Sequence, residues 1–198
     1  CVILNEQRTG KSGAFTAGVD YLQREGLVRG VLVAAPLTLL ELVWKKELKP
    51  MVPHALIAVI RDAEPQYIVR TFGSRTSKQK TAPGRTAIEV LREARKNAAR
   101  NPALPAWYFI NSDKLRHDKA VVQELEFMLQ AGEINMIGLD ESTEFANIEA
   151  GRTSALLDML AKAPYDGLRR VAMTGTPGGP MKVFALSKII DPVRCSIN

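Results

Sequence analysis

The chain has 198 residues and a formal net charge of +6, with 46% hydrophobic and 24% charged residues, as expected for a globular domain with one sizeable core. No apolar stretch is long enough to span a membrane, because Glu41 and Lys45 close the apolar run that starts at Val31. No secretory signal is visible, and the two cysteines, Cys1 and Cys195, cannot form a disulfide framework. We therefore expect reduced thiols, no membrane partner and an intracellular location, cytoplasmic or nuclear.

Short apolar runs alternate with segments of helical periodicity along the whole chain. The apolar runs predict strands that are mostly buried on both faces. In chain order, these strands are expected at Val2–Leu4, Val31–Ala35, Leu56–Ile60, Ala106–Ile110, Ile134–Leu139 and Arg170–Met173.

The segments between these strands predict helices. The first helix carries Phe15, Val19 and Leu22 at helical spacing and ends near Gly26. The others are expected at Leu37–Leu48, Thr86–Arg100, Asp118–Gln130, Arg152–Ala163 and Met181–Ile190. Residues Gly73–Gly84 are polar, basic and without periodicity, and they predict a loop. Strands that alternate with helices in this way predict an α/β domain with three layers, αβα, around a mainly parallel sheet.

Two short strings carry the chemistry of a nucleoside-triphosphate site. Glu6-Gln7-Arg8-Thr9-Gly10-Lys11-Ser12 joins the first strand to the first helix, where backbone N–H groups cradle phosphates, the Lys reaches the terminal phosphates and the Ser hydroxyl binds Mg²⁺. Met136-Ile137-Gly138-Leu139-Asp140-Glu141-Ser142 places Asp140 at the end of a buried strand, where it would bind the same metal. Glu141 would orient or deprotonate an attacking water. Both strings lie at carboxyl ends of strands, where ligands of parallel sheets bind.

The positive charge is concentrated in one segment. Residues 70–100 hold nine Lys or Arg residues against Glu89 and Glu93, so this segment alone carries +7 and the rest of the chain −1. Such a segment indicates an anionic partner such as nucleic acid, although a solvated loop and helix face would have the same composition. Trp44 and Trp107 are expected in the core.

Further segments complete a pattern together with the loop at Asn5–Ser12. They are Leu32–Leu40 with Trp44 and Glu47-Leu48, then Tyr108–Arg116, Leu139–Ser142, Ala172–Pro177 and Phe184–Pro192. In this order, the motifs resemble those of the first RecA-like lobe of superfamily-two helicases, most closely the Swi/Snf-type DNA translocases. The resemblance covers the chain from about Val2 to Pro192.

This resemblance implies an ATP hydrolase of the helicase or translocase type that depends on nucleic acid, DNA more than RNA, with ATP and Mg²⁺ as cofactors. It assigns Lys11 and Glu141 to catalysis and Ser12 and Asp140 to the metal. ATP would contact Gln7, Arg8, Thr9, Gly10, Lys11, Ser12 and Gly13. Coupling to the nucleic acid would use Thr174, Gly175 and Thr176. The nucleic acid itself would contact Pro36, Leu37 and Thr38, and the basic residues Arg75, Lys78 and Lys80 are further candidates.

The resemblance also implies a second RecA-like lobe, which would supply an arginine finger and half of the nucleic-acid track. Residues 1–198 are therefore expected to form a single ATP-binding lobe that is part of a longer or split protein and is weakly active alone.

Other interpretations of these residues stay open. Lys11 is also compatible with a surface lysine after a turn, and Asp140 and Thr38 with helix caps. A P-loop ATPase or kinase of another class would share the phosphate loop. A nucleic-acid-binding module with a degenerate nucleotide site is the third alternative, which Arg8 within the loop favours.

Overall fold

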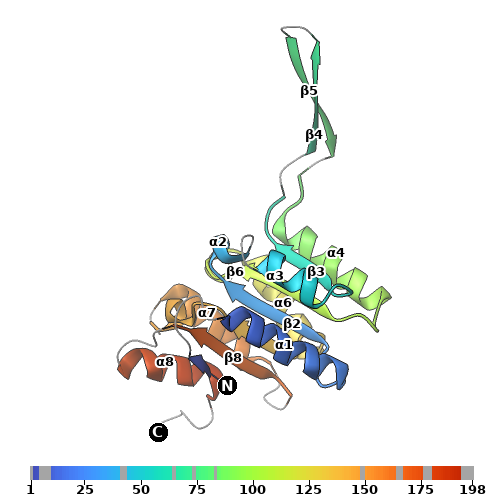
Figure 1. Ribbon diagram of the computed structural model, residues 1–198. Coiled ribbons are helices and arrows are strands. Elements are labelled where there is room, and N and C mark those ends of the chain that lie inside the picture. Colours follow the sequence, from blue (N-terminus) through green and yellow to red (C-terminus); the bar gives the residue numbers. More distant parts are fainter. Residues whose placement is uncertain are drawn as a thin grey trace.

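The computed structural model describes residues 2–4, 10–40, 44–63, 66–72, 75–82, 84–147, 150–163, 167–175 and 180–192, and for 66–72 and 75–82 the backbone alone (Figure 1). Its centre is a sheet of six parallel strands in the order β1-β8-β7-β2-β6-β3. The strands are β1 (Val2–Leu4), β2 (Gly30–Ala35), β3 (Leu56–Ile60), β6 (Ala106–Asn111), β7 (Met136–Leu139) and β8 (Arg169–Thr174). The expected parallel sheet is confirmed, and each strand agrees with its predicted position within two residues.

Helices cover both faces of this sheet (Figure 1). They are α1 (Lys11–Arg24), α2 (Leu37–Leu39), α3 (Lys45–Met51), α4 (Ala87–Arg100), α5 (Lys114–His117), α6 (Lys119–Gln130), α7 (Gly151–Ala161) and α8 (Pro180–Ile190), with a 3₁₀ turn, η2, at Ser142–Phe145. Among the described residues, no helix is both long and apolar enough to cross a bilayer.

Alternate residues of the strands enter two separate cores. In β2, Val31 and Val33 pack with Phe15 of α1 and Trp44 beside α3, whereas Leu32 packs with residues of α4, α6 and α7 on the other face. Because both faces of β2 are covered, the whole strand is buried, as its continuous apolar run predicts. The fold is therefore a three-layer α/β domain of the RecA-like kind, as expected.

One prediction about the fold is wrong. Residues 73–84 were expected to form a loop, but most of them belong to β5 (Arg75–Ala82), which pairs in antiparallel fashion with β4 (Gln66–Phe72). The reason is that most of the apolar and β-branched residues that favour a strand lie in β4, and the mainly polar β5 becomes a strand by pairing with them. These two strands form a β-ribbon, the β4–β5 ribbon, which extends away from the body of the domain (Figure 1).

The expected helix at Leu37–Leu48 corresponds to two short helices, α2 and α3, with residues 41–43 outside the described part of the chain. Leu40 and Trp44, on either side of this gap, are both fully buried. The expectation that Trp44 and Trp107 lie in the core is confirmed, since neither is exposed to solvent.

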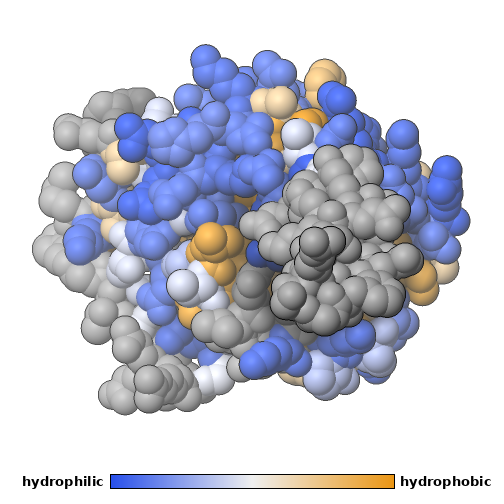
Figure 2. All heavy atoms as spheres, turned by 90° about the horizontal axis from the view of Figure 1, so that it is seen from above, coloured by the Kyte–Doolittle hydropathy of each residue, from blue (hydrophilic) through white to orange (hydrophobic). Residues whose placement is uncertain are grey.

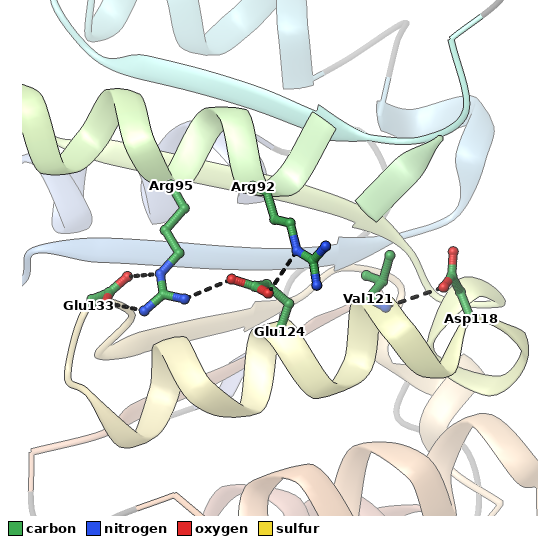
Figure 3. A network of polar contacts seen from close by, with 6 residues as sticks. All are labelled: Arg92, Arg95, Asp118, Val121, Glu124 and Glu133. Carbon is green, nitrogen blue, oxygen red and sulfur yellow. Dashed lines mark hydrogen bonds and ion pairs between the residues drawn. The ribbon is translucent and has the colours of Figure 1, made fainter. Parts of the chain in front are cut away.

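Two arginines of the basic segment are structural (Figure 3). On α4, Arg95 donates to Glu133 at 2.6 and 2.7 Å and to Glu124 of α6 at 2.7 Å, while Arg92 donates to Glu124 at 3.2 Å. Burial raises the pKa of Glu124, but the hydrogen bonds from Arg95 and Arg92 outweigh this effect and leave the pKa below its ordinary value. These two positive charges therefore join α4 to α6 and to the loop after it.

Gly138 in β7 lets α1 approach the sheet closely. A Cβ atom at this position would lie 2.6 Å from the ring of Phe15. That ring is buried and makes edge contacts with Trp44 and Trp107, at centroid distances of 5.8 and 6.1 Å, so it has little room to move. Helix α1 is thus seated directly on β7, the strand that leads into Asp140.

We predict that Gly138→Ala destabilises the domain by about 1–3 kcal/mol, because the added methyl group overpacks this contact. The matched control is Gly18→Ala in α1, where a Cβ meets no atom within 4 Å. That change should instead be neutral or stabilise the domain by about 0.5–1 kcal/mol, because alanine favours a helix. Urea unfolding of both variants checks the prediction, and equal stability of the two would contradict it.

Candidate nucleotide site

The predicted site residues follow strands whose carboxyl ends share one edge of the sheet. Leu4 at the end of β1 pairs with Thr174 at the end of β8, and Leu139 at the end of β7 lies between Ala172 and Ala34. The backbone N–H of Asp140 then donates to the Ala34 carbonyl at 2.9 Å. One strand, β8, therefore lies between β1, which precedes the predicted phosphate loop, and β7, which precedes Asp140.

Helix α1 begins at this edge in a form that suits an anion. Gly10 has a left-handed backbone (φ 82°), which costs little only for glycine, and the Ala14 N–H closes the first helical turn on its carbonyl at 2.9 Å. No acidic residue occupies the first turn, and no side chain among the described residues caps the helix. The positive end of the helix dipole is thus not neutralised by the helix itself. Gln7, Arg8 and Thr9 lie outside the described residues.

Lys11, the first residue of α1, is a buried residue with 8% of its surface exposed. Burial raises the pKa of Asp140, and the positive charge of Lys11 is one of the effects that oppose this rise. Ser12 and Gly13 are half-buried beside Lys11, and the Ser12 carbonyl accepts a hydrogen bond from the Thr16 hydroxyl at 2.8 Å. The structure therefore brings Lys11 into electrostatic range of Asp140, although the two lie more than a hundred residues apart in the sequence.

Asp140 is a buried carboxylate, 4% exposed, with two neutral hydrogen-bond donors. The Trp44 indole N–H donates to Oδ2 at 2.8 Å and the Glu141 backbone N–H to Oδ1 at 3.0 Å. Burial raises the pKa of Asp140 above its ordinary value, while the Trp44 hydrogen bond, the Glu141 N–H and the Lys11 charge oppose that rise. Burial outweighs these opposing effects, so a further positive charge at this position would stabilise the ionised form.

Among the described residues, no three His, Cys, Asp or Glu side chains gather as a metal-binding group. Mg²⁺ does not require such a group, because it commonly takes one or two carboxylates and completes its shell with water and phosphate oxygens. The buried carboxylate of Asp140 and the hydroxyl of Ser12 are the hard oxygen ligands that such a site needs. The residues present therefore fit a magnesium ion that binds together with a phosphate group.

Glu141 has an unusual backbone. It is the sole non-glycine residue with positive φ in the described part of the chain (φ 49°, ψ 50°), and a left-handed conformation costs such a residue about 1–2 kcal/mol. Non-glycine residues in this region cluster at functional sites. The next residue, Ser142, is fully buried, and its hydroxyl has no hydrogen-bond partner among the described residues.

Some of the other predicted residues lie at the same edge of the sheet. For the rest, the side chains are outside the described part of the structure. Thr174 is fully buried at the end of β8 and Gly175 follows it, whereas Thr176 lies outside the described residues. Pro36 is half-buried and Leu37 and Thr38 are exposed at the start of α2, which follows the carboxyl end of β2. For Arg75, Lys78 and Lys80, the structure gives only backbone positions in β5.

Two hollows lined by described residues lie away from this edge and contain no predicted site residue. One, of about 350 Å³, runs along the edge strand β3 against α4. The other, of about 870 Å³, lies at the amino-terminal end of the sheet beside Arg29, His54 and Pro105.

Sequence reasoning missed a polar network beside the site. The Ser112 hydroxyl donates to Glu144 at 2.5 Å, and Arg152 of α7 donates to Glu144 at 3.4 Å and to Asp113 at 3.2 Å. The signal for this network in the sequence is only weak. Ser112 and Glu144 both follow strands of the parallel sheet, which places them at the same edge but does not predict that they bond to each other. For Trp44, which was expected only to pack, no sequence signal indicated a bond to Asp140.

We predict that Trp44→Phe destabilises the metal-free domain by about 1–3 kcal/mol at pH 7, because a buried carboxylate loses a hydrogen-bond donor. Trp107→Phe is the matched control, since the Trp107 indole is equally buried but donates to the uncharged Gln23 amide at 3.2 Å. Its removal should cost about 0.5–1.5 kcal/mol. The measurement is urea unfolding with EDTA, and a larger loss in the control would contradict the assigned importance of the Asp140 bond.

Comparison with protein-family models gave no match, and neither did comparison with curated proteins. Among solved structures, the SWI2/SNF2 ATPase core of Sulfolobus solfataricus in complex with dsDNA is similar over 97% of this chain, with a TM-score of 0.59 and 18% sequence identity. This chain spans 31% of that chain. The N-terminal domain of the DNA packaging ATPase from bacteriophage phi29 matches 98% of this chain and 81% of its own, with 13% identity and a TM-score of 0.46. At 18% identity, the likeness to the SWI2/SNF2 core establishes the fold alone, a three-layer α/β fold of the RecA-like kind.

Proposed function

We propose that the chain is the ATP-binding and ATP-hydrolysing lobe of a helicase-like, DNA-dependent ATPase or translocase. The observation that carries this proposal is the buried Asp140 carboxylate. It lies in range of the Lys11 charge and at the same sheet edge as the uncapped start of α1. A buried acid, a buried lysine and a helix N-terminus at the carboxyl ends of parallel strands are the parts of a triphosphate site.

In this proposal, the N–H groups of Gly10–Gly13 and the Lys11 amine bind the phosphates, with Gln7, Arg8 and Thr9 completing the loop. Ser12 and Asp140 would hold Mg²⁺, which would supply charge neutralisation for the phosphate groups when bound. Glu141 accepts a proton from the attacking water or orients it. Thr174, Gly175 and Thr176, at the end of the strand between the two motifs, link the terminal phosphate to the nucleic-acid side.

For the nucleic acid, we propose two contacts near the same sheet edge. Pro36, Leu37 and Thr38 form the start of α2. The β4–β5 ribbon leaves the body between β3 and α4, where Ala63 and Arg85 exchange hydrogen bonds at 2.8 and 3.0 Å at its base. Most of the residues that are coloured in Figure 2 are hydrophilic, and the apolar side chains among them form small separate patches. Such a surface suits a charged partner rather than an apolar one.

The ribbon itself has the composition of a nucleic-acid-binding element. Residues 66–82 contain four Lys or Arg residues and no Asp or Glu. In the register of the two strands, Lys78 pairs with Val69 and Lys80 with Tyr67, which places these positions on one face, whereas Arg75 pairs with Phe72 on the other. The basic segment alone predicts phosphate contacts without stacking. The pairing also places two aromatic residues of β4, Tyr67 and Phe72, opposite Lys80 and Arg75.

A second RecA-like lobe, in the same or another chain, also belongs to this proposal. The single lobe accounts for 31% of the similar SWI2/SNF2 core chain. An arginine from the second lobe would stabilise the charge on the transferred phosphoryl group, in addition to the charge that Lys11 provides.

The first prediction concerns ATP. Lys11→Ala should abolish ATP binding, because the site loses its fixed cation at the β- and γ-phosphates. Glu141→Gln should leave binding within about twofold and slow hydrolysis by about 10²–10⁴-fold, since the amide keeps the shape but cannot take up a proton. Lys46→Ala, on the exposed side of α3, is the charge-matched control. Equal loss of binding in the first two variants would show that Glu141 is structural.

The second prediction concerns nucleic acid. Changing Arg75, Lys78 and Lys80 together to Ala should weaken duplex DNA binding and reduce its dependence on salt, by about one unit of log–log slope for each phosphate that the ribbon no longer neutralises. The control removes three exposed lysines elsewhere, Lys49, Lys119 and Lys182, for the same change in net charge. Fluorescence anisotropy over a series of salt concentrations checks this. An unchanged slope in the ribbon variant would assign the ribbon to solvent.

A further inference from the structure

The turn that carries Glu141 continues into η2, and Glu144 in this turn connects it to two other elements. The Glu144 carboxylate accepts the Ser112 hydroxyl at 2.5 Å and lies 3.4 Å from the Arg152 guanidinium of α7. Within the turn, the Glu144 N–H donates to the Glu141 carbonyl at 2.9 Å. The backbone of Glu141 is therefore joined by one hydrogen bond to the residue that carries these outside contacts.

Ser112 is a rigid anchor for this contact. It is 1% exposed, and its backbone N–H donates to the Ala35 carbonyl at the end of β2 at 3.2 Å. Arg152 is the second anchor, since it is held by Asp113 as well as by Glu144. The Glu144 carboxylate thus joins the turn to the central strands through Ser112 and to α7 through Arg152.

The polar attachment of the turn depends strongly on Glu144. Ser142 makes no side-chain hydrogen bond to any described residue, and Phe145 contributes apolar packing in the core but no polar contact. Apolar packing fixes the depth of a turn better than its rotation, because it is not directional. A short hydrogen bond and an ion pair are directional. Glu141 needs such restraint, since its left-handed backbone is not its preferred conformation.

We propose that Glu144, held by Ser112 and Arg152, is a positioning residue that fixes the orientation of Glu141 for hydrolysis. It does not touch the reacting atoms and acts only through the turn. This inference rests on the proposed ATPase function. It predicts that loss of Glu144 impairs the hydrolytic step while ATP binding, which depends on the start of α1, is kept.

The first experiment compares Glu144→Ala with Glu144→Gln. In Glu144→Ala, kcat should fall about 10–100-fold with ATP affinity within about twofold of the wild type, because a misplaced base affects only the chemical step. Glu144→Gln keeps an acceptor for Ser112 and should restore most of kcat. Wild-type kcat in Glu144→Ala would overturn the proposal, as would a parallel loss of ATP affinity.

The matched control is Glu124→Gln, which breaks a comparable pair of contacts, to Arg92 and Arg95, far from the turn. If Glu144→Ala lost activity only because the fold is weakened, Glu124→Gln at a similar melting temperature would lose it as well. The proposal expects unchanged kcat in this control.

A second measurement is independent of turnover. Amide hydrogen exchange of the nucleotide-free protein should be at least several-fold faster at residues 141–146 in Glu144→Ala than in the wild type, with α6 unchanged as the internal reference. Unaltered exchange in this turn would overturn the proposal even if the protein proved inactive. A wild type that binds no ATP would instead defeat the proposed function, so the two failures are distinguishable.

Discussion

The buried carboxylate of Asp140 is the constraint on which the rest of this structure depends. A carboxylate removed from water loses several kcal/mol of solvation unless donors or cations replace it. Here the replacements come from three parts of the chain: the indole of Trp44, the N–H of Glu141 and the charge of Lys11. The Trp44 indole is in turn fixed by Phe15 and Phe109, at centroid distances of 5.8 and 5.6 Å. The aromatic core on this face of the sheet therefore does more than exclude water, because it aims a donor at the site.

The close approach of α1 to the sheet serves the same constraint. Phe15 lies over Gly138, two residues before Asp140, so the helix that starts at Gly10 is seated on the strand that ends at Asp140. A larger residue at Gly138 would raise the helix and with it Lys11. The distance between Lys11 and Asp140 thus depends on the small size of Gly138 in β7 and on the rigid ring of Phe15 in α1. Packing and electrostatics are coupled at this point, and neither can be changed alone.

Much of the fold and the core of the site could be predicted from the sequence, because both follow from patterns that act over short distances. The apolar runs predicted the six parallel strands, and parallel strands must bring Lys11 and Asp140 to the same edge. The ribbon was missed because β5 has no apolar pattern of its own and becomes a strand only through β4. Arg92 and Arg95 appeared as part of a basic patch, yet acidic partners about thirty residues away neutralise them. The bond from Trp44 to Asp140 joins residues 96 positions apart and has no sequence signal.

The turn after β7 shows how small the energies are that set the geometry of such a site. A left-handed Glu141 costs about 1–2 kcal/mol. A hydrogen bond to a charged group contributes about 1.5–3 kcal/mol, and the partly exposed ion pair with Arg152 about 0–1 kcal/mol. The strain and the restraints are therefore of similar size, so the orientation of Glu141 depends on a few contacts rather than on the stability of the whole domain.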